Sequence, residues 1–419
     1  MQKTARFPPL HKRQKPALDG TGEHQGFEIN LLKVILGIIV ATLLGMERIT
    51  SMREVKFVKK YVLAINPGST STKVALFKEE EAVMKNTIDH STKELEKYNN
   101  IAEQYELRKN NILQWMTANG VKKEELKAVV GRGGLLRPMP GGTYKVTPPM
   151  EKDLKIGYQG EHASNLGGLI AKAIGEEEGV PSFIVDPVAV DEFTEEARIS
   201  GIPQIQRRSL GHALNIKAVG HRVANELGKT FQEVNLVVAH LGGGISVAPV
   251  KKGRILDYNN ANEMGPFSPE RTGGLPVGDL AKLCFSGEYD LKTLKAKLRG
   301  KGGISAYLGT NDAREVEAKI KEGDQKAKLI YDAMGYQIAK EIAAMATVLE
   351  GKIDAVVVTG GIAHSDYLMN LIKEHVAFLG KFFVHPGEDE MQALNEGALR
   401  VLMEEEEAKI YEEEVNVND

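Results

Sequence analysis

A β-strand, a turn of small residues and a second β-strand recur in the two halves of this chain, and this repeat constrains the fold more than any other feature. The first copy spans residues 61–77, where two apolar runs flank a polar turn at residues 66–71. The second copy spans residues 235–250 and turns at three consecutive glycines, residues 242–244. Apolar runs between glycine-rich turns predict buried strands. We therefore expect an α/β protein with two related domains that face one nucleotide.

Both turns have the composition of a phosphate-binding loop. Gly68 lets the backbone approach an anion, neighbouring hydroxyl and N–H groups can donate to it, and Lys73 can add a positive charge. An ordinary hairpin with a polar turn is the alternative for this first loop. The three adjacent glycines of the second turn are poorly explained by packing, because glycine weakens strands. His240, at the end of the strand before them, is a candidate site group.

Charged residues follow two other predicted strands. Arg132 stands between glycines after the short apolar strand 128–130, and Asp186 ends the strand 182–186 just before a proline. Ligands of α/β proteins bind at the carboxyl ends of strands, and arginine is suited to holding a carboxylate or a phosphate. The alternatives are a surface arginine in a flexible loop and an aspartate that caps the following segment.

The second half contains further candidates. A glycine pair, Gly360-Gly361, follows the predicted strand 354–358 and could form a backbone shelf for a base or ribose. Arg271 lies in the glycine-rich loop 261–280, and long ordered loops in compact domains are usually functional.

Two more positions have two interpretations each. His212 precedes a predicted amphipathic helix that ends at residue 227, and it is either a core histidine or a site group. The acidic run 388–390 opens the last long helix, where carboxylates favour the helix dipole. Capping of the helix and contact with a metal ion are the two interpretations of this run.

The composition excludes several classes of protein. A net charge of −3 gives no sign of nucleic-acid binding. The single cysteine, Cys284, excludes an internal disulfide framework and fits a reducing, cytoplasmic compartment. Its apolar surroundings predict a buried structural thiol, and the acidic tail from Glu404 is expected to be solvated.

Residues 1–58 differ in composition from the rest of the chain. A basic cluster at residues 11–15 is followed by the apolar stretch 29–46, which is marginal in length for a membrane-spanning helix and starts late for a signal peptide. The expectations are a spurious or disordered extension, a weak membrane anchor, or upstream sequence before a start at Met46 or Met52.

Three motifs of the chain resemble the acetokinase family of short-chain carboxylate kinases. They are Asn66-Pro67-Gly68-Ser69-Thr70-Ser71-Thr72-Lys73, His240-Leu241-Gly242-Gly243-Gly244 and Thr359-Gly360-Gly361-Ile362. The resemblance covers roughly residues 58–405 in order. Pro67 makes the first motif more similar to the butyrate kinases than to the acetate kinases, which usually have alanine or cysteine there.

This resemblance implies a fold and an activity. The implied fold has two duplicated actin-like, ribonuclease H-like domains with a nucleotide cleft between them, over residues 59–190 with 388–410 and over residues 191–387. The implied activity is reversible phosphorylation of butyrate by ATP, with Mg²⁺, in a dimer or larger homo-oligomer. A kinase for acetate, propionate or branched-chain acids is the nearest alternative, and a non-enzymatic ATP-binding module is a remote one.

The site residues of the family transfer motif by motif. The resemblance implies nucleotide contacts from Asn66, Gly68, Ser69, Ser71, Lys73, His240, Gly242, Gly243, Gly244, Gly360 and Gly361. Arg132 matches the substrate-binding arginine, Asp186 the aspartate at the centre of the active site, and Glu390 the glutamate near the metal. The resemblance thus implies that Asp186 and Glu390 hold Mg²⁺.

Three departures from the family leave assignments open. The second turn has Gly243 where acetate kinases have asparagine. The second arginine of the family has no direct match, and Arg271 is taken in its place. The transition-state histidine aligns with either His212 or Asn215, and His212 or His240 is expected to donate to the transferred group, with His212 taken as the catalytic residue.

Overall fold

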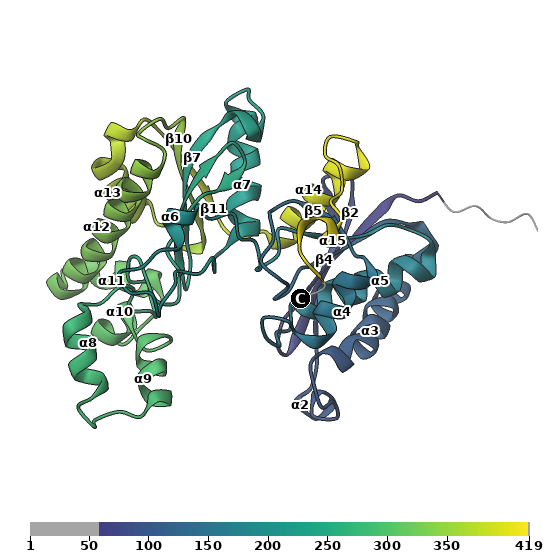
Figure 1. Cartoon of the computed structure of the whole chain (residues 1–419), viewed down its shortest axis with the longest axis horizontal. Helices are drawn as coiled ribbons and strands as arrows, with labels where there is room; N and C mark the ends of the chain where they lie inside the picture. Colours follow the sequence, from purple (N-terminus) through teal and green to yellow (C-terminus); the bar gives the residue numbers. More distant parts are fainter. Residues whose placement is uncertain (1–57, 418–419) are drawn as a thin grey trace, which may run out of the picture. The chain divides into compact units, whose positions relative to one another are not determined.

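The computed structural model describes residues 58–417, and the expectations of an extension, a membrane anchor or a later start fall on residues outside this part. Within it lie two β-sheets with helices around them (Figure 1), as the α/β prediction requires. No helix among these residues is long and apolar enough to cross a membrane.

The first sheet contains β1 (Tyr61–Pro67), β2 (Ser71–Lys78), β3 (Glu81–Asp89), β4 (Leu126–Arg132), β5 (Thr143–Lys145) and β6 (Ser182–Val185). Their order in the sheet is β3-β2-β1-β4-β6-β5. The β1–β2 and β2–β3 pairs are antiparallel, whereas β1–β4 and β4–β6 are parallel. β5 pairs antiparallel with β6 at the edge.

The second sheet contains β7 (Asn235–Leu241), β8 (Ile245–Lys251), β9 (Arg254–Ile255), β10 (Ala355–Gly360) and β11 (Lys381–Pro386). Their order is β11-β10-β7-β8-β9. β7–β8 and β8–β9 are antiparallel, and β7–β10 and β10–β11 are parallel. Apart from the edge strand β5, the second sheet therefore repeats the first strand for strand. Both predicted hairpins, β1–β2 and β7–β8, are confirmed.

Helices bury both faces of the first sheet, as the alternation along β1 requires. Leu63 and Ile65 point to one face and pack under α3 (Tyr105–Ala118), α4 (Pro148–Ile156) and α5 (Asn165–Glu178). Val62 and Ala64 point to the other face and share a cluster with α14 (Glu390–Leu402). The predicted last long helix thus packs on the first sheet.

The second sheet is covered in the same way. Val237 packs with α12 (Gln325–Val348) and α13 (Asp366–Val376), whereas Val238 packs with α7 (Ala213–Glu226). α7 also contributes Leu214 and Ala218 to the cluster of α14, so one helix joins the cores of the two sheets.

The remaining helices connect these layers. They are α2 (Thr92–Leu95), α6 (Glu195–Arg198), α8 (Val277–Cys284), α9 (Leu291–Leu298), α10 (Gly303–Leu308), α11 (Ala313–Lys321) and α15 (Tyr411–Glu414). Short 3₁₀ turns lie at Ala102–Gln104, Lys123–Glu125, Phe231–Glu233, Gly361–His364 and Ala377–Leu379.

Two expectations about exposure are wrong. Cys284 is exposed, because the apolar side chains around α8 have no core to pack against; Val277 is 82% and Phe285 is 91% exposed. The acidic tail is not solvated throughout, since Tyr411 is fully buried and its hydroxyl donates to Asp153 Oδ2 (2.9 Å).

Two glycines let α5 approach the end of β4 closely. A Cβ atom on Gly131 would lie 2.0 Å from Gly167 O, and one on Gly167 would lie 2.3 Å from Arg132 O. Because β4 ends at Arg132, this crossing fixes where the arginine leaves the sheet.

Replacement of either glycine by alanine is expected to be strongly destabilising. Gly131→Ala and Gly167→Ala would force the backbones of β4 and α5 apart in the packed core, and this would lower the free energy of unfolding by about 1–3 kcal/mol or more. Gly278→Ala is the matched control, since a Cβ atom there meets nothing within 4 Å in helix α8; it should be neutral or slightly stabilising. Thermal unfolding measures all three variants. An unfolding temperature of Gly131→Ala equal to that of the wild type would contradict the close contact between β4 and α5.

Candidate active site

The first glycine turn opens onto a pocket of about 300 Å³. Gly68 N donates to Ser71 O (2.7 Å) and closes the turn. Asn66 and Lys73 are paired across the hairpin and frame it from both strands. The pocket is lined by Asn66, Pro67, Gly68, Ser71, Lys73, Arg132, His162, Ser164, Val188 and Glu390. The predicted groups of this turn therefore converge, except that Ser69 belongs to the turn without lining the pocket.

Glu390 stands between two other predicted groups of this pocket. Asn66 Nδ2 donates to Glu390 Oε2 (2.5 Å), and Arg132 Nη1 lies 3.3 Å from Glu390 Oε1. The second contact lacks hydrogen-bond geometry, and the buried Arg132 Nη1 has no hydrogen-bond partner within residues 58–417. A buried donor left unpaired costs free energy. Arg132 Nη1 can therefore still donate a hydrogen bond to an anionic ligand.

The second glycine turn lies beside a carboxylate that the sequence analysis did not single out. Glu388 Oε1 is 2.9 Å from His240 Nε2, and a Cβ atom on Gly242 would lie 2.8 Å from the same oxygen. The close contact with His240 Nε2, together with the charges of Lys73 and Arg132, lowers the pKa of Glu388. Glu388 is therefore a carboxylate at neutral pH. Its only sequence signal was its place in the acidic run 388–390.

The middle residue of that run has the simpler role. Asp389 is the N-cap of α14 and accepts a hydrogen bond from Gln392 N (3.0 Å). The capping interpretation thus applies to Asp389, whereas Glu388 and Glu390 face the two turns.

Two histidines stack against each other at the ends of β7 and α7. The ring centroids of His212 and His240 are 3.9 Å apart, with an interplanar angle of 13°. His212 Nδ1 pairs with Ser246 Oγ (3.0 Å), and His240 Nδ1 with Asn215 Oδ1 (2.8 Å). Asn215, the alternative to His212 in the alignment, therefore supports a histidine of the same pair.

His212 is uncharged at neutral pH. Burial, the neighbouring His240 and the charges of Arg132 and Arg271 lower its pKa well below the ordinary value. Arg132, at the end of β4, and Arg271, in the loop before α8, are therefore near enough for their charges to act on the same imidazole. A neutral imidazole can still donate a hydrogen bond to an anion.

Arg271 is held against the second glycine turn. Its Nη1 donates to Ala261 O (3.1 Å), and a Cβ atom on Gly244 would lie 2.3 Å from that nitrogen. Gly244 must therefore lack a side chain for the guanidinium to take this place. The buried Arg271 Nε has no hydrogen-bond partner in the described part of the chain.

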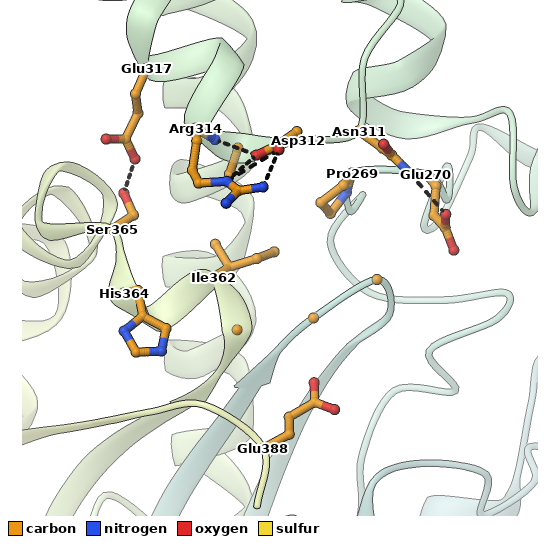
Figure 2. A pocket seen from close by; sticks show the side chains of 14 residues that line it. Pro269, Glu270, Asn311, Asp312, Arg314, Glu317, Ile362, His364, Ser365 and Glu388 are labelled. Carbon is orange, nitrogen blue, oxygen red and sulfur yellow. Dashed lines mark hydrogen bonds and ion pairs between the residues drawn. The ribbon is translucent and has the colours of Figure 1, made fainter. Parts of the chain in front are cut away.

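A larger pocket, of about 760 Å³, adjoins the second turn (Figure 2). Side chains from the start of α11 and the start of α13 face each other across it. Arg314 is paired with Asp312 (2.6 Å), and Glu317 Oε1 accepts from Ser365 Oγ (2.5 Å). The lining residues are Gly242, Gly243, Pro269, Glu270, Asn311, Asp312, Ala313, Arg314, Glu317, Gly361, Ile362, His364, Ser365 and Glu388.

The sequence analysis missed the polar residues 311–317 of this pocket. Their only local signal is a small-residue turn before a short helix, which is common in any protein. The two glycines of the predicted shelf, Gly360 and Gly361, have different roles. Gly361 lines the pocket, whereas Gly360, with φ of 93°, packs its backbone against Leu241 O, 2.3 Å from the place of a Cβ atom.

Asp186 lies apart from Glu390. It follows β6 with φ of 37°, is 3% exposed, and accepts a hydrogen bond from Gly142 N (2.7 Å). Burial raises its pKa to about 6, although the charge of Lys217 opposes the shift. The contacts of Glu390 are instead with Asn66 and Arg132. Within residues 58–417, no group of three or more Asp, Glu, His or Cys side chains is arranged to hold a metal ion.

The raised pKa of Asp186 predicts a pH-dependent effect on stability. An aspartate titrates near 3.9 when unfolded, so the folded protein loses stability as the pH rises from about 4 to 6 and carries the full cost above that range. Asp186→Asn should therefore gain stability relative to the wild type as the pH rises from 4.5 to 7, by about 2 kcal/mol. Thermal unfolding at both pH values measures it.

The control for this experiment is Asp366→Asn. Asp366 is exposed in the first turn of α13, so its replacement should shift the unfolding temperature equally at both pH values. A pH-independent difference for Asp186→Asn as well would show that Asp186 is ionised at both.

The chain has relatives along most of its length. A model of the acetokinase family matches residues 203–416. A probable butyrate kinase 2 of Caldanaerobacter subterraneus is 52% identical over 350 residues, which cover 84% of this chain and 99% of that protein. Butyrate kinase 2 of Clostridium acetobutylicum is 53% identical over 351 residues, covering 84% and 99%.

Solved structures share the fold at lower identity. Acetate kinase of Porphyromonas gingivalis superimposes with a TM-score of 0.66 at 21% identity, over 82% of this chain and 100% of that one. A propionate kinase of Francisella tularensis gives a TM-score of 0.64 at 20% identity, over 80% and 98%. The prediction of two duplicated domains of this fold is confirmed.

Proposed function

Since this chain belongs to the acetokinase family, we propose that it transfers the γ-phosphoryl group of ATP to the carboxylate of a short fatty acid, with butyrate as the preferred acid. The observation that carries the proposal is that Arg132 Nη1 and Arg271 Nε are buried without a hydrogen-bond partner among the described residues, while the charges of both arginines act on His212. A site with two such arginines can bind the two anions of the reaction, the carboxylate of the acid and the phosphoryl group of ATP, close to each other.

The chemistry requires charge neutralisation rather than a strong base. A fatty acid is already ionised at neutral pH, so its oxygen can attack the γ-phosphorus while the bond to the β-γ bridging oxygen breaks and ADP leaves with that electron pair. The enzyme must align the two anions and stabilise the charge of the transferred group. We assign the carboxylate to Arg132, the phosphoryl group to Arg271, and a hydrogen bond to that group to the neutral His212.

The nucleotide would extend along the second sheet. We assign adenosine to the 760 Å³ pocket beside Gly361, and the phosphates to the two glycine turns, with Lys73 and His240 beside them. The backbone N–H groups of such turns bind phosphate oxygens. The kinase family implies the use of ATP, and these pockets support this path for it.

Mg²⁺ fits the residues near the turns. It usually binds one or two carboxylates together with substrate phosphates and waters, and Glu388 and Glu390 are carboxylates beside the two turns. In this reaction the ion would neutralise charge on the β- and γ-phosphates. We propose Glu390 as a contact of the ion and keep Asp186 as a proposed catalytic and metal carboxylate, although its present contacts support a positioning role. A homo-oligomer and a cytoplasmic location remain predictions from the sequence.

An acyl phosphate assay tests the reaction and the acid together. Full-length protein with ATP and Mg²⁺ should convert butyrate to a product trapped by hydroxylamine, and faster than acetate, propionate, isobutyrate or isovalerate. A maximum at another acid would keep the mechanism and change the substrate. Binding of ATP with no product from any acid would contradict the kinase proposal and favour an ATP-binding module.

Removal of Arg132 should abolish most of the activity. Arg132→Ala deletes a positive charge next to the reacting carboxylate, and loss of such a group typically lowers the rate by about 10²–10³-fold. Steady-state kinetics with the preferred acid measure the loss. Arg254→Ala, at an exposed position of β9, should keep wild-type rates. Wild-type turnover by Arg132→Ala would exclude Arg132 from the site.

A further inference from the structure

Arg108 is a fully enclosed arginine behind the first glycine turn. It projects from α3 and is only 1% exposed. None of the ion pairs within residues 58–417 includes it. Burial of a guanidinium without a carboxylate costs several kcal/mol. Burial lowers its pKa to about 10, so it is still charged at neutral pH, and other groups must compensate its charge.

The backbone of the first turn supplies that compensation. Arg108 Nη1 donates to Gly68 O (2.8 Å) and Ser71 O (3.0 Å), and Nη2 donates to Ser69 O (3.1 Å). The remaining carbonyl of the turn, Thr70 O, accepts from the backbone N of His90 (2.8 Å). All four carbonyls of residues 68–71 are therefore held from within the protein.

Side chains around the guanidinium complete the support. Arg108 Nη2 also donates to Gln104 Oε1 (2.8 Å), and Nη1 to Thr72 Oγ1 (3.1 Å). Thr72 Oγ1 is in turn 2.8 Å from His90 Nε2. Burial and the charge of Arg108 lower the pKa of His90, so this histidine adds no second charge to the network. Of the guanidinium nitrogens, Nε alone lacks a partner among the described residues.

Anchored carbonyls decide where the amides of the turn point. The peptide unit is planar and trans, so a C=O directed at Arg108 turns the N–H of the following residue the opposite way. The carbonyls of Gly68 and Ser69 therefore direct the N–H groups of Ser69 and Thr70 away from the guanidinium. Neither N–H has an acceptor among the hydrogen bonds of residues 58–417, and outward N–H groups of a tight turn form an anion site.

We propose that Arg108 is a positioning residue of the nucleotide site. It holds the carbonyls of the first turn so that the N–H groups of Ser69 and Thr70 are fixed toward a phosphate, and its charge raises the positive potential there. The inference rests on the proposed function for the identity of the anion, a nucleotide phosphate, but not for the existence of the anion site.

Binding separates this role from a merely structural one. In Arg108→Met the affinity for ATP should fall about ten-fold, the loss of one or two good hydrogen bonds, while the affinity for adenosine, which has no phosphate, should change less than two-fold. Arg108→Lys keeps the charge but cannot span three carbonyls, and its ATP affinity should lie between those of the wild type and Arg108→Met. Calorimetry on the full-length protein measures each.

The matched control is Arg137→Met, another buried arginine of the same domain, which is paired with Asp153 (2.7 Å). It should lower the unfolding temperature without changing the ratio of ATP to adenosine affinity. If Arg108→Met does not fold, Gln104→Met removes only the outer partner of the guanidinium and should lower ATP affinity about two-fold to five-fold.

The outcomes distinguish this inference from the proposed function. An unchanged ratio of ATP to adenosine affinity in folded Arg108 or Gln104 variants would overturn the positioning role. Loss of ATP affinity in these variants, in a protein that forms no acyl phosphate, would uphold the anion site and contradict the kinase proposal alone. In an active enzyme the KM for ATP should rise while the KM for the acid stays within two-fold, and the reverse pattern would count against Arg108.

Discussion

The rest of this structure depends on holding the positive charges of Arg132 and Arg271 near each other, although nearby carboxylates neutralise them only in part. Arg132 and Arg271 both lower the pKa of the half-buried His212, and like charges in a medium of low dielectric constant repel each other. Such groups cannot assemble by themselves, so packing elsewhere must hold them together. Glu390 beside Arg132 and Glu388 beside His240 offset part of the charge. The remainder is what a phosphate or carboxylate would bind.

The repeated sheet supplies that packing. Each first hairpin turns at glycines, and each parallel core is buried on both faces by helices. Arg132 leaves the end of β4, where the Gly131–Gly167 contact allows no sideways movement. His212 stands at the start of α7, whose side chains pack into the cores of both sheets. The charged groups thus stand at the ends of strands and helices whose other residues are buried. The free energy of that burial offsets the repulsion between the positive charges.

Local pattern predicted both hairpins with their turns, the strands that end near Arg132, Asp186 and Gly360, and the helices α7 and α14, because hydrophobic periodicity and the placement of glycines are properties of neighbouring residues. It could not predict burial that depends on distant partners. Arg108 lies in the polar stretch YELRKNN, and only contact with a turn some forty residues earlier makes it internal. The apolar run around Cys284 suggests a core segment, but Cys284 is exposed because no other part of residues 58–417 covers it. Asp312 and Arg314 line the larger pocket because of how α11 and α13 are arranged in space. The sequence near these residues does not predict that arrangement.

The acidic run that opens α14 shows why residue type alone does not assign a site. Only Glu390 lies in helix α14, whereas Asp389 is its N-cap and Glu388 precedes the cap, so the three neighbouring carboxylates do not share one face of a helix. Asp389 accepts the capping hydrogen bond, Glu390 turns to Asn66 and Arg132, and Glu388 lies on the far side against His240. Asp389 is used by the cap, and its two neighbours are left for the site. The two that remain stand beside different glycine turns, Glu390 by the first and Glu388 by the second, so neighbouring residues of one acidic run serve two separate parts of the site.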